Sequence, residues 1–451
     1  MPDFANMSLS RLVRPEGYAC SCGRHHVCAL KYLNIGRGII NEVPKMVAAM
    51  GKKKPFVVCD GNTWAVAGRQ VDEILTAAGI DHVVYVVPLE KPENVRIAPA
   101  EWETGSIIMH FDPTCDMFLA VGSGVINDLC KVAAYATGRP TAVVGTAPSM
   151  DGYASSSSSM VINGCKVSLI NACPAAIICD IDIIKDAPMR MLHAGLGDML
   201  AKYIGLCEWR IVELINGEYR CENVAALMRA SVDKIVANAP GLRRREPAAV
   251  QATVEGLVLS GIAMSYAGSS RPASGLEHYF SHLWEMMALE RGVPYELHGI
   301  QVGVGTLLGL RVYDQIRTMT PDREKALAFV QNFDTARWEG EMRRIFGSAG
   351  DELIRQEYET LHNNDKAAHA ERLERIIAHW DDIQRIIREE LPETEKIVAL
   401  MREVEAPMVP ADIAINNQDT NDAFHYARNT RNKYLTSSML WDLGLLYDMT
   451  L

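Results

Sequence analysis

The side chains best suited to nucleotide chemistry follow two apolar runs in the first half of the chain. Met117–Val121 turns through Gly122-Ser123-Gly124 into a helical pattern, and Thr141–Gly145 opens into a polar loop. This order of elements is strand, glycine turn, helix, strand and loop. It is the order that places a pyrophosphate on N–H groups at a helix N-terminus. Glycine alone marks many turns, but two such strand ends together indicate a dinucleotide site. The loop carries Thr146, Ser149, Asp151 and Ser155.

Three later helical patterns carry an acid or histidines that could bind a metal. Asp198 interrupts an apolar pattern, where an unpaired carboxylate is costly. His278 and His282 are four residues apart and share one helix face, and His298 begins an apolar helix. One acid and two imidazoles from three helices can hold a divalent ion and leave positions open for a substrate, as catalytic zinc sites do.

Each of these residues also has an ordinary structural interpretation. A lone histidine on an apolar helix is more often a hydrogen-bonded core residue than a ligand. Asp198 could pair with Lys202 or Arg190, and Glu277 and His193 compete as ligands. Spacing alone therefore does not choose the ligand set.

A cysteine cluster near the N-terminus is a weaker candidate for a metal site. Cys20, Cys22 and Cys28 flank two histidines, but Cys-x-Cys is tighter than the usual two-residue spacing and no second pair follows nearby. The sequence favours a short hairpin with buried thiols. The chain has eleven cysteines, an odd count without a regular framework, which indicates reduced thiols and a cytoplasmic protein.

Length and charge limit the class of protein. A chain of 451 residues is too long for one ordinary core, so two domains are expected. The formal charge of -11 argues against nucleic-acid binding, which needs a clustered basic surface. The sequence shows no apolar run of membrane-spanning length and no signal-peptide pattern, so no membrane insertion is expected.

Periodicity predicts an α/β domain followed by a helical one. The expected strands alternate with helices at Val43–Met50, Ala65–Ala78 and Val125–Thr137, which predicts a parallel, Rossmann-like sheet. Past Lys185 only helical patterns remain, beginning with Met189–Glu213. We therefore predict domains at residues 1–187 and 188–451. The expected strands are Phe56–Cys59, Val83–Val87, Met117–Val121, Ala142–Gly145 and Ala176–Cys179.

Two further segments stand out by composition. Arg323–Glu405 is highly charged at helical spacing, which is typical of the solvated face of helices that pack on a core. The serine run Ser155–Ser159 follows the proposed nucleotide loop, so we expect it to face a ligand. The core-facing residues expected in the charged segment are Ile354, Leu373, Ile376, Ile377, Ile383 and Ile387.

Taken together, these motifs resemble one known family over nearly the whole chain. The sequence is similar to the sn-glycerol-1-phosphate dehydrogenases, within the iron-type alcohol dehydrogenase, glycerol dehydrogenase and dehydroquinate synthase superfamily, and closest to the bacterial branch. Ser123 stands where much of the superfamily has glycine, and 321–405 matches only loosely. The motifs are Gly122–Asp128, Thr146–Gly152, Gly195–Met199, Ser270–Gly275 with Glu277-His278, His298-Gly299 and Trp441–Leu446.

The resemblance implies a nicotinamide-binding α/β domain and an all-helical, dehydroquinate synthase-like metal domain. It assigns Asp198, His278 and His298 as metal ligands, and Asp151 and His282 as substrate contacts. Asp198 thereby also touches the substrate. The implied coenzyme contacts are Asp60, Gly122, Ser123, Gly124, Val125, Ile126, Thr146, Ala147, Pro148, Ser149 and Ser155.

The same resemblance implies an activity. The expected reaction is reduction of dihydroxyacetone phosphate to sn-glycerol 1-phosphate by NADH or NADPH, with one zinc or nickel ion, in a homodimer. An acid at position 60 favours NAD, because it repels a 2′-phosphate. Lys202 and Arg271 are candidates for binding the substrate phosphate. The alternatives are a dehydrogenase for another polyol or phosphorylated ketone, a lyase of the dehydroquinate synthase kind, and a non-catalytic NAD-binding protein.

Overall fold

The computed structural model describes every residue except 1, 91–96, 163–164 and 450. The chain forms two compact units. The first comprises Met1–Met199 and Cys221–Ser270, and the second comprises Leu200–Arg220 and Arg271–Leu451. The strands of the described residues all belong to the first unit, and the second unit is helical.

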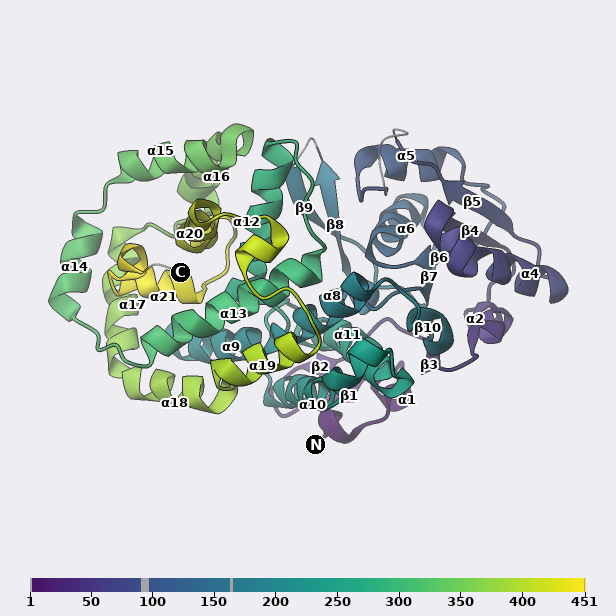
Figure 1. The fold of residues 1–451 in the computed structure, drawn as a ribbon, viewed down its shortest axis with the longest axis horizontal. Coiled ribbons are helices and arrows are strands. Elements are labelled where there is room, and N and C mark those ends of the chain that lie inside the picture. The colour runs from purple at the N-terminus through teal and green to yellow at the C-terminus, as the bar shows by residue number, and fades with distance from the viewer. Residues whose placement is uncertain (1, 91–96, 163–164, 450) are drawn as a thin grey trace. The chain divides into compact units, whose positions relative to one another are not determined.

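The first unit is built on a six-stranded parallel sheet (Figure 1) with the order β3-β10-β7-β6-β4-β5. Its central strands are apolar on both faces, as expected of a parallel sheet covered on both sides. The predicted parallel sheet is therefore confirmed. The strands are β3 (Tyr32–Gly36), β4 (Pro55–Asp60), β5 (Val83–Val87), β6 (Met117–Gly122), β7 (Thr141–Gly145) and β10 (Ala176–Asp180).

Helices cover the two faces of the sheet with different side chains. On one face, α2 (Val43–Ala49) and α4 (Arg69–Ala77) pack on alternate strand residues such as Val57 and Leu119. The other face carries Phe56 and Phe118, whose rings meet edge to face at 5.5 Å. The chain covers this face with α5 (Glu101–Met109) and α6 (Gly124–Thr137).

Several strands escaped the sequence prediction. The edge strand β3 is one, and two antiparallel hairpins are the others. The first hairpin joins β1 (Tyr18–Ala19) to β2 (His25–His26), and the second joins β8 (Ser157–Ile162) to β9 (Cys165–Ile170). Three serines of the run expected to face a ligand, Ser157 to Ser159, therefore form the start of β8. Serine has no marked strand preference, so neither propensity nor alternation reveals this strand.

The chain after the sheet is helical throughout its described residues, as predicted. The single helix predicted over Met189–Glu213 is two helices, with a break at Ala201. The last strand of the described residues ends at Asp180, and the two compact units interleave along the chain, so the division into residues 1–187 and 188–451 stays a prediction. The helices are α7 (Ile181–Ile184), α8 (Met189–Leu200), α9 (Lys202–Asn216), α10 (Glu222–Asn238), α11 (Pro247–Ala267), α12 (Leu276–Glu290), α13 (His298–Ile316), α14 (Arg323–Gln331), α15 (Thr335–Phe346), α16 (Gly350–Gln356), α17 (Lys366–Ala378), α18 (Trp380–Glu390), α19 (Thr394–Glu403), α20 (Asn417–Tyr426) and α21 (Thr436–Asp442).

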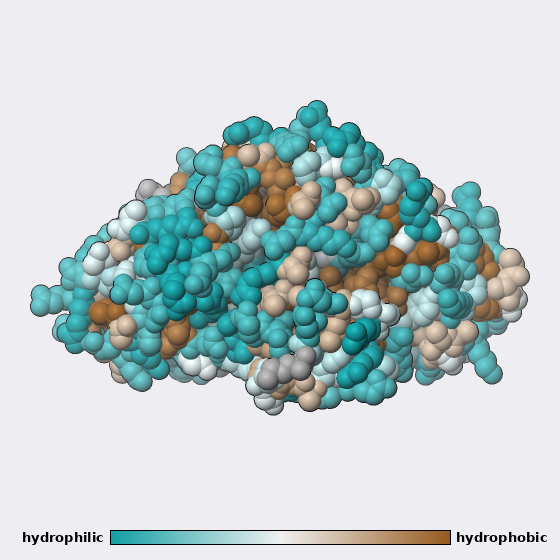
Figure 2. All heavy atoms as spheres, turned by 90° about the horizontal axis from the view of Figure 1, so that it is seen from below, coloured by the Kyte–Doolittle hydropathy of each residue, from teal (hydrophilic) through white to brown (hydrophobic). Residues whose placement is uncertain are grey.

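Helix α11 corrects the expectation that no apolar run is long enough to span a membrane. By length and composition alone, this 21-residue helix could cross a membrane. Most of the helix is buried, however, and it packs against α10. We therefore interpret α11 as a core helix. On the face shown in Figure 2, hydrophilic residues predominate and hydrophobic ones gather in separate patches, as is usual for protein surfaces.

The charged segment forms helices α14 to α19, whose apolar side chains point inward. Of the six core residues predicted there, all but Ile377 are buried, and Ile377 is half-buried. The C-terminal helix α21 is tied to this segment by Asp442, whose carboxylate accepts two hydrogen bonds of 2.9 Å from Arg372. The segment is therefore structural, as predicted.

Asp180, the last residue of β10, binds backbone groups beyond the carboxyl end of the sheet. This buried carboxylate accepts hydrogen bonds from the backbone N–H groups of Gly38, Ile40 and Asp182, at 3.1, 2.9 and 2.9 Å. Replacing it by alanine leaves three donors without their acceptor, and each such loss costs roughly 1 kcal/mol or more.

We predict that Asp180→Ala lowers the free energy of unfolding by roughly 2–4 kcal/mol, measured as a lower urea midpoint. The control is Asp182→Ala. Its exposed side chain pairs with Arg37, so its removal should change stability by less than about 1 kcal/mol. Equal midpoints for the two variants would contradict this account.

Candidate functional site

The predicted nucleotide residues lie at a reversal of strand order in the sheet. Strand β4 is followed by the outer strand β5, whereas β6 is followed by β7 on the other side. The register pairs Val58 with Ala120, so Asp60 and Gly122 end neighbouring parallel strands at the same level. Ligands of open α/β sheets bind outside the carboxyl ends of strands at such a switch point.

Helix α6 begins directly after this strand end. Ser123 is its N-cap residue and has no side-chain cap bond to the helix. The N–H groups of the first turn, which includes Gly124, Val125 and Ile126, therefore keep their capacity to bind an anion. Ser123 has a φ of -111°, a conformation that does not require glycine. Its hydroxyl lies 2.6 Å from that of Ser149, which links the turn to the second loop.

Asp60 is held rigidly at the end of β4. One carboxylate oxygen, Oδ1, accepts a hydrogen bond of 2.7 Å from the N–H of Thr63, and the Thr63 hydroxyl accepts one of 2.9 Å from the Asp60 N–H. Among the residues that the structure describes, no donor binds the other oxygen, Oδ2. That oxygen is suited to accept the hydroxyl protons of a ribose.

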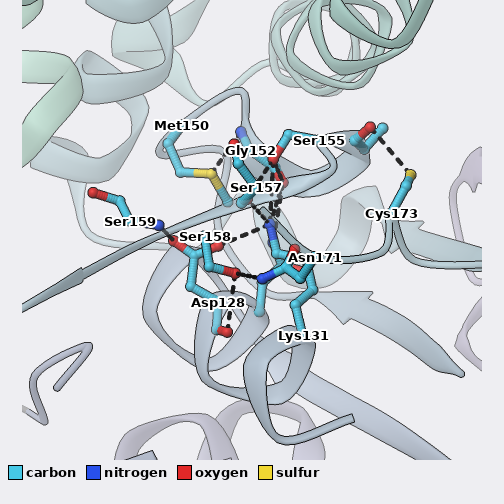
Figure 3. A network of polar contacts seen from close by, with 12 residues as sticks. Asp128, Lys131, Met150, Gly152, Ser155, Ser157, Ser158, Ser159, Asn171 and Cys173 are labelled. Atoms are coloured by element: carbon cyan, nitrogen blue, oxygen red, sulfur yellow. Dashed lines mark hydrogen bonds and ion pairs between the residues drawn. The ribbon is translucent and has the colours of Figure 1, made fainter. Parts of the chain in front are cut away.

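The loop after β7 is anchored on α6 through a buried ion pair (Figure 3). The Lys131 ammonium lies 2.9 Å from an Asp128 oxygen and donates to the Ser155 hydroxyl at 3.2 Å and to the Gly152 carbonyl at 3.4 Å. Asp128 also accepts the N–H of Ser159 at 3.0 Å. Helix and loop therefore form one polar network, and Ser155 belongs to it.

The rest of the nucleotide loop is fixed by backbone and tyrosine contacts. The N–H of Thr146 donates to the Gly122 carbonyl at 3.1 Å, and the Tyr153 hydroxyl donates to the Ala147 carbonyl at 2.6 Å. Burial raises the pKa of Tyr153, so this hydroxyl keeps its proton. Ala147 and Pro148 are themselves buried, which leaves Thr146 and Ser149 as the polar side chains of this stretch.

Asp151 and Asp198 are adjacent within the first unit. The N–H of Asp151 donates to Asp198 Oδ2 at 2.9 Å, and the Ser260 hydroxyl donates to Asp151 Oδ2 at 2.8 Å. Helix α8 comes this close because it carries Gly195, where a Cβ atom would lie 2.0 Å from the Pro148 carbonyl oxygen. The fully buried Asp198 is thus brought to the loop by a glycine contact.

His278 and His298 are adjacent within the second unit. Their ring centroids are 5.3 Å apart, and one ring nitrogen of each lies within 4.8 Å of the other. Helices α12 and α13 approach closely at Gly305, where a Cβ atom would lie 2.6 Å from the Glu277 carbonyl oxygen. Because His298 begins α13 and His278 lies in the first turn of α12, this approach brings the two rings together.

Hydrogen bonds at Nδ1 fix the tautomer of both rings. His278 Nδ1 lies 2.8 Å from Glu277 Oε1, a carboxylate that can only accept in its ionised form. His298 Nδ1 lies 2.9 Å from the Ser281 hydroxyl, whose own proton points to Gln301 at 2.8 Å. Both Nδ1 atoms therefore carry hydrogen, and the lone pair of each ring is on Nε2.

Glu277, which competed as a ligand on spacing alone, instead orients His278. Its Oε1 accepts from the Gly275 N–H at 2.6 Å as well as from His278. The carboxyl group of Glu208 lies on the same side of Gly275, since a Cβ atom there would be 2.8 Å from Glu208 Oε2 and 2.9 Å from Glu277 Oε2. Burial and this neighbouring charge raise the pKa of Glu208 above its usual range.

The remaining predicted residues differ in their surroundings. His282 lies half-buried on α12, and its ring centroid is 5.6 Å from that of His298. Arg271 is buried and forms a two-pronged ion pair with Glu218, at 2.7 and 2.6 Å. This pairing is a structural alternative to phosphate binding. Lys202 is fully buried at the start of α9.

Sequence patterns did not reveal the polar residues that hold these groups. Ser260 supports Asp151, and Ser281 and Gln301 support His298. Ser260 and Gln301 sit inside largely apolar helices, and Ser281 sits among the buried residues of α12. A buried serine one helical turn after His278 was the available signal for Ser281, because i and i+3 share a face.

Comparisons with known proteins agree on one family. A family profile described as iron-containing alcohol dehydrogenase matches residues 34–188. A glycerol-1-phosphate dehydrogenase [NAD(P)+] from Halalkalibacterium halodurans is 34% identical over 295 residues, 65% of this chain and 73% of that one. The enzyme of the same name from Bacillus licheniformis is 28% identical over 432 residues, 95% of this chain and 93% of that one.

The fold is shared with more distant solved structures. A 1,3-propanediol oxidoreductase matches with a TM-score of 0.59 at 14% identity, covering 93% of this chain and 98% of that one. The predicted fold class, a parallel α/β part followed by a helical part, is confirmed by this likeness and by the sheet itself.

We predict that Ser281→Ala weakens divalent-metal binding by about 10- to 100-fold, because His298 loses the partner that fixes its ring. Competition with a chromophoric chelator measures the affinity. The control is Ser231→Ala, since Ser231 is also buried on a helix but bonds only the Leu227 carbonyl of its own helix. An affinity equal to that of the unmodified chain would show that Ser281 does not position a ligand.

Proposed function

The chain belongs to the glycerol-1-phosphate dehydrogenase family, and we propose that it reduces dihydroxyacetone phosphate to sn-glycerol 1-phosphate with a nicotinamide coenzyme. The balanced reaction consumes NADH or NADPH and one proton, and it yields the oxidised coenzyme. Similarity over 95% of the chain to a relative of that name supports applying the activity to the whole protein.

The observation that carries the proposal is the pair of imidazoles on α12 and α13. Two histidines that share one tautomer, with ring nitrogens within 4.8 Å, are suited to one common ion.

We propose that Asp198, His278 and His298 hold one divalent ion together. A carboxylate and two imidazoles are nitrogen and oxygen donors that suit zinc or nickel, and three protein ligands leave coordination positions for a substrate oxygen. Asp198 fits this role because its carboxylate is fully buried and its Oδ2 is held by the Asp151 N–H at 2.9 Å, so the group is already fixed in place.

The coenzyme contacts proposed from the sequence lie in the first unit. Asp60 accepts ribose hydroxyl protons at Oδ2, and the first turn of α6 binds the pyrophosphate with its N–H groups. Ser123, Thr146 and Ser149 supply hydroxyl groups beside that turn, and Ser155 supports it through Lys131. An acid at position 60 favours NADH over NADPH.

When bound, the metal would polarise the substrate carbonyl and the reduced nicotinamide would supply the hydride. The chain supplies orientation and a proton. Asp151, whose Oδ2 is held by Ser260, accepts a substrate hydroxyl and fixes the carbon that receives the hydride. His282 holds the proton that passes to the new alcohol oxygen, since it is half-buried beside His298.

The proposal extends to the substrate, the oligomeric state and the cellular compartment. The substrate is a small phosphorylated triose, and the buried cations Lys202 and Arg271 are the candidates for binding its phosphate. We also propose a homodimer in the cytoplasm, as the family resemblance implies.

We predict that the purified chain oxidises NADH with dihydroxyacetone phosphate, loses this activity on chelation and regains it with zinc or nickel. Asp198→Ala and His278→Ala should each lower kcat/KM by about 1,000-fold or more, because polarisation of the carbonyl contributes several kcal/mol. His82→Ala is the control, since His82 pairs with Asp72 on α4. Preference for unphosphorylated dihydroxyacetone, or unaltered rates in the ligand variants, would overturn the proposal.

We predict that Asp60→Ser shifts the ratio of kcat/KM for NADPH over NADH upward by about tenfold, because it removes roughly 1.4 kcal/mol of repulsion from a 2′-phosphate. Serine keeps an oxygen that can cap α3 (Gly61–Thr63), so the helix start survives. Steady-state kinetics with both coenzymes measure the ratio. Thr63→Ala disturbs the same cap without removing the charge and should leave the ratio unchanged; an equal shift there would assign the effect to the cap.

A further inference from the structure

Four metal-binding side chains of the first unit converge near the N-terminus. Cys20 and Cys22 lie in the turn between β1 and β2, His26 lies on β2, and Cys221 is the N-cap residue of α10. One potential ligand atom from each lies within 4.8 Å of the other three. None of the four belongs to the candidate catalytic residues.

This cluster corrects the interpretation of the N-terminal cysteines. The predicted hairpin is present, but Cys20 and Cys22 are only half-buried, and Cys28 is the buried thiol. No second cysteine pair follows nearby in the sequence, but in the folded chain two further ligands lie beside Cys20 and Cys22. His26 and Cys221 supply that pair, and they are separated by 195 residues, beyond the reach of any spacing rule.

The distances within the cluster match a tetrahedral zinc site. Zinc lies about 2.3 Å from sulfur and about 2.0–2.1 Å from nitrogen, so the edges of the tetrahedron measure about 3.8 Å between sulfurs and about 3.6 Å between sulfur and nitrogen. The Sγ atoms of Cys20 and Cys221 are 3.8 Å apart. His26 Nε2 lies 3.3 Å from Cys22 Sγ and 3.5 Å from Cys221 Sγ.

The same distances do not fit a disulfide. A disulfide bond is about 2.05 Å long, and the 3.8 Å between the sulfurs of Cys20 and Cys221 is nearly twice that. Small displacements of a few tenths of an ångström would suffice to bind an ion, whereas a disulfide would need a much larger approach of the two sulfurs.

The groups around the cluster orient its ligands. His26 is fully buried, and its Nδ1 lies 2.8 Å from the carbonyl oxygen of Tyr266. A carbonyl can only accept, so Nδ1 carries the hydrogen and the Nε2 lone pair faces the sulfurs. The amide of Asn223 donates to Cys20 Sγ at 3.2 Å. Cys221 stands at the N-terminus of a 17-residue helix, where the dipole favours a thiolate.

We propose that Cys20, Cys22, His26 and Cys221 bind one structural zinc ion. Three thiolates and an imidazole are a donor set that selects zinc, and four protein ligands leave no position open for a substrate. The ion fastens the N-terminal hairpin to α10. Next to it, Arg24 bonds the Ala267 carbonyl at 3.0 Å, so the hairpin is also held against the end of α11.

X-ray absorption at the zinc edge of the whole, unmodified chain tests this site directly. The expected spectrum contains sulfur neighbours at about 2.3 Å. The set Asp198, His278 and His298 contains no sulfur, so this signal reports on the cysteine cluster whatever the catalytic site binds. Zinc surrounded only by nitrogen and oxygen, or a chain that holds no zinc after purification in zinc-containing medium, would overturn the proposal.

Variants locate the ion. Cys22→Ser and Cys221→Ser should each lose about one zinc equivalent per chain and lower the midpoint of thermal unfolding, because an ion bound only by the native state stabilises it. Cys28→Ser changes a nearby buried thiol outside the cluster and should keep the bound zinc. Unchanged zinc content in the first two variants, or a Cys20–Cys221 disulfide found by mass spectrometry of protein purified without air, would contradict the assignment.

Discussion

Close backbone contact at two glycines sets where the candidate metal ligands lie. Gly195 lets α8 rest on the carbonyl of Pro148, and Gly305 lets α13 rest on the carbonyl of Glu277. In each case a Cβ atom would overlap the oxygen, so any other residue would push the helices apart. The first contact brings Asp198 to the loop that carries Asp151, and the second brings His298 to His278. Both halves of the proposed centre are therefore built by helix approach rather than by flexible loops.

Buried polar partners then fix the direction of each group. Glu277 and Ser281 hold the Nδ1 atoms of the two histidines, and Ser260 holds Asp151. Because these partners sit on helices α11 and α12, little reorganisation is needed when a ligand binds, and preorganised groups stabilise developing charge most effectively. The arrangement also explains why polar side chains are tolerated inside apolar helices, where each finds a hydrogen-bond partner.

The sequence predicted most of the sheet, because its central strands are buried on both faces and read as continuous apolar runs. Phe56–Cys59 and Met117–Val121 stand out in this way, and the edge strand Val83–Val87 was found because it is also a continuous apolar run. The edge strand Tyr32–Gly36 and the hairpin that begins at Ser157 were missed, since partly exposed or serine-rich strands lack such a run. The candidate ligands were found by type, but their supporting residues depend on contacts between helices, which no local pattern encodes. The role of Cys221 was hidden for the same reason.

The position of Cys221 has a consequence for how the chain is made. The hairpin that carries His26 leaves the ribosome before α10, and the contact between His26 and Cys221 spans 195 residues. At synthesis rates of about 5–20 residues per second, the hairpin waits roughly 10–40 s before α10 emerges. During that interval its thiols and aromatic rings are exposed in the nascent chain. Completion of the α/β unit is thus delayed until α10, which follows the last strand of the sheet, has also been translated.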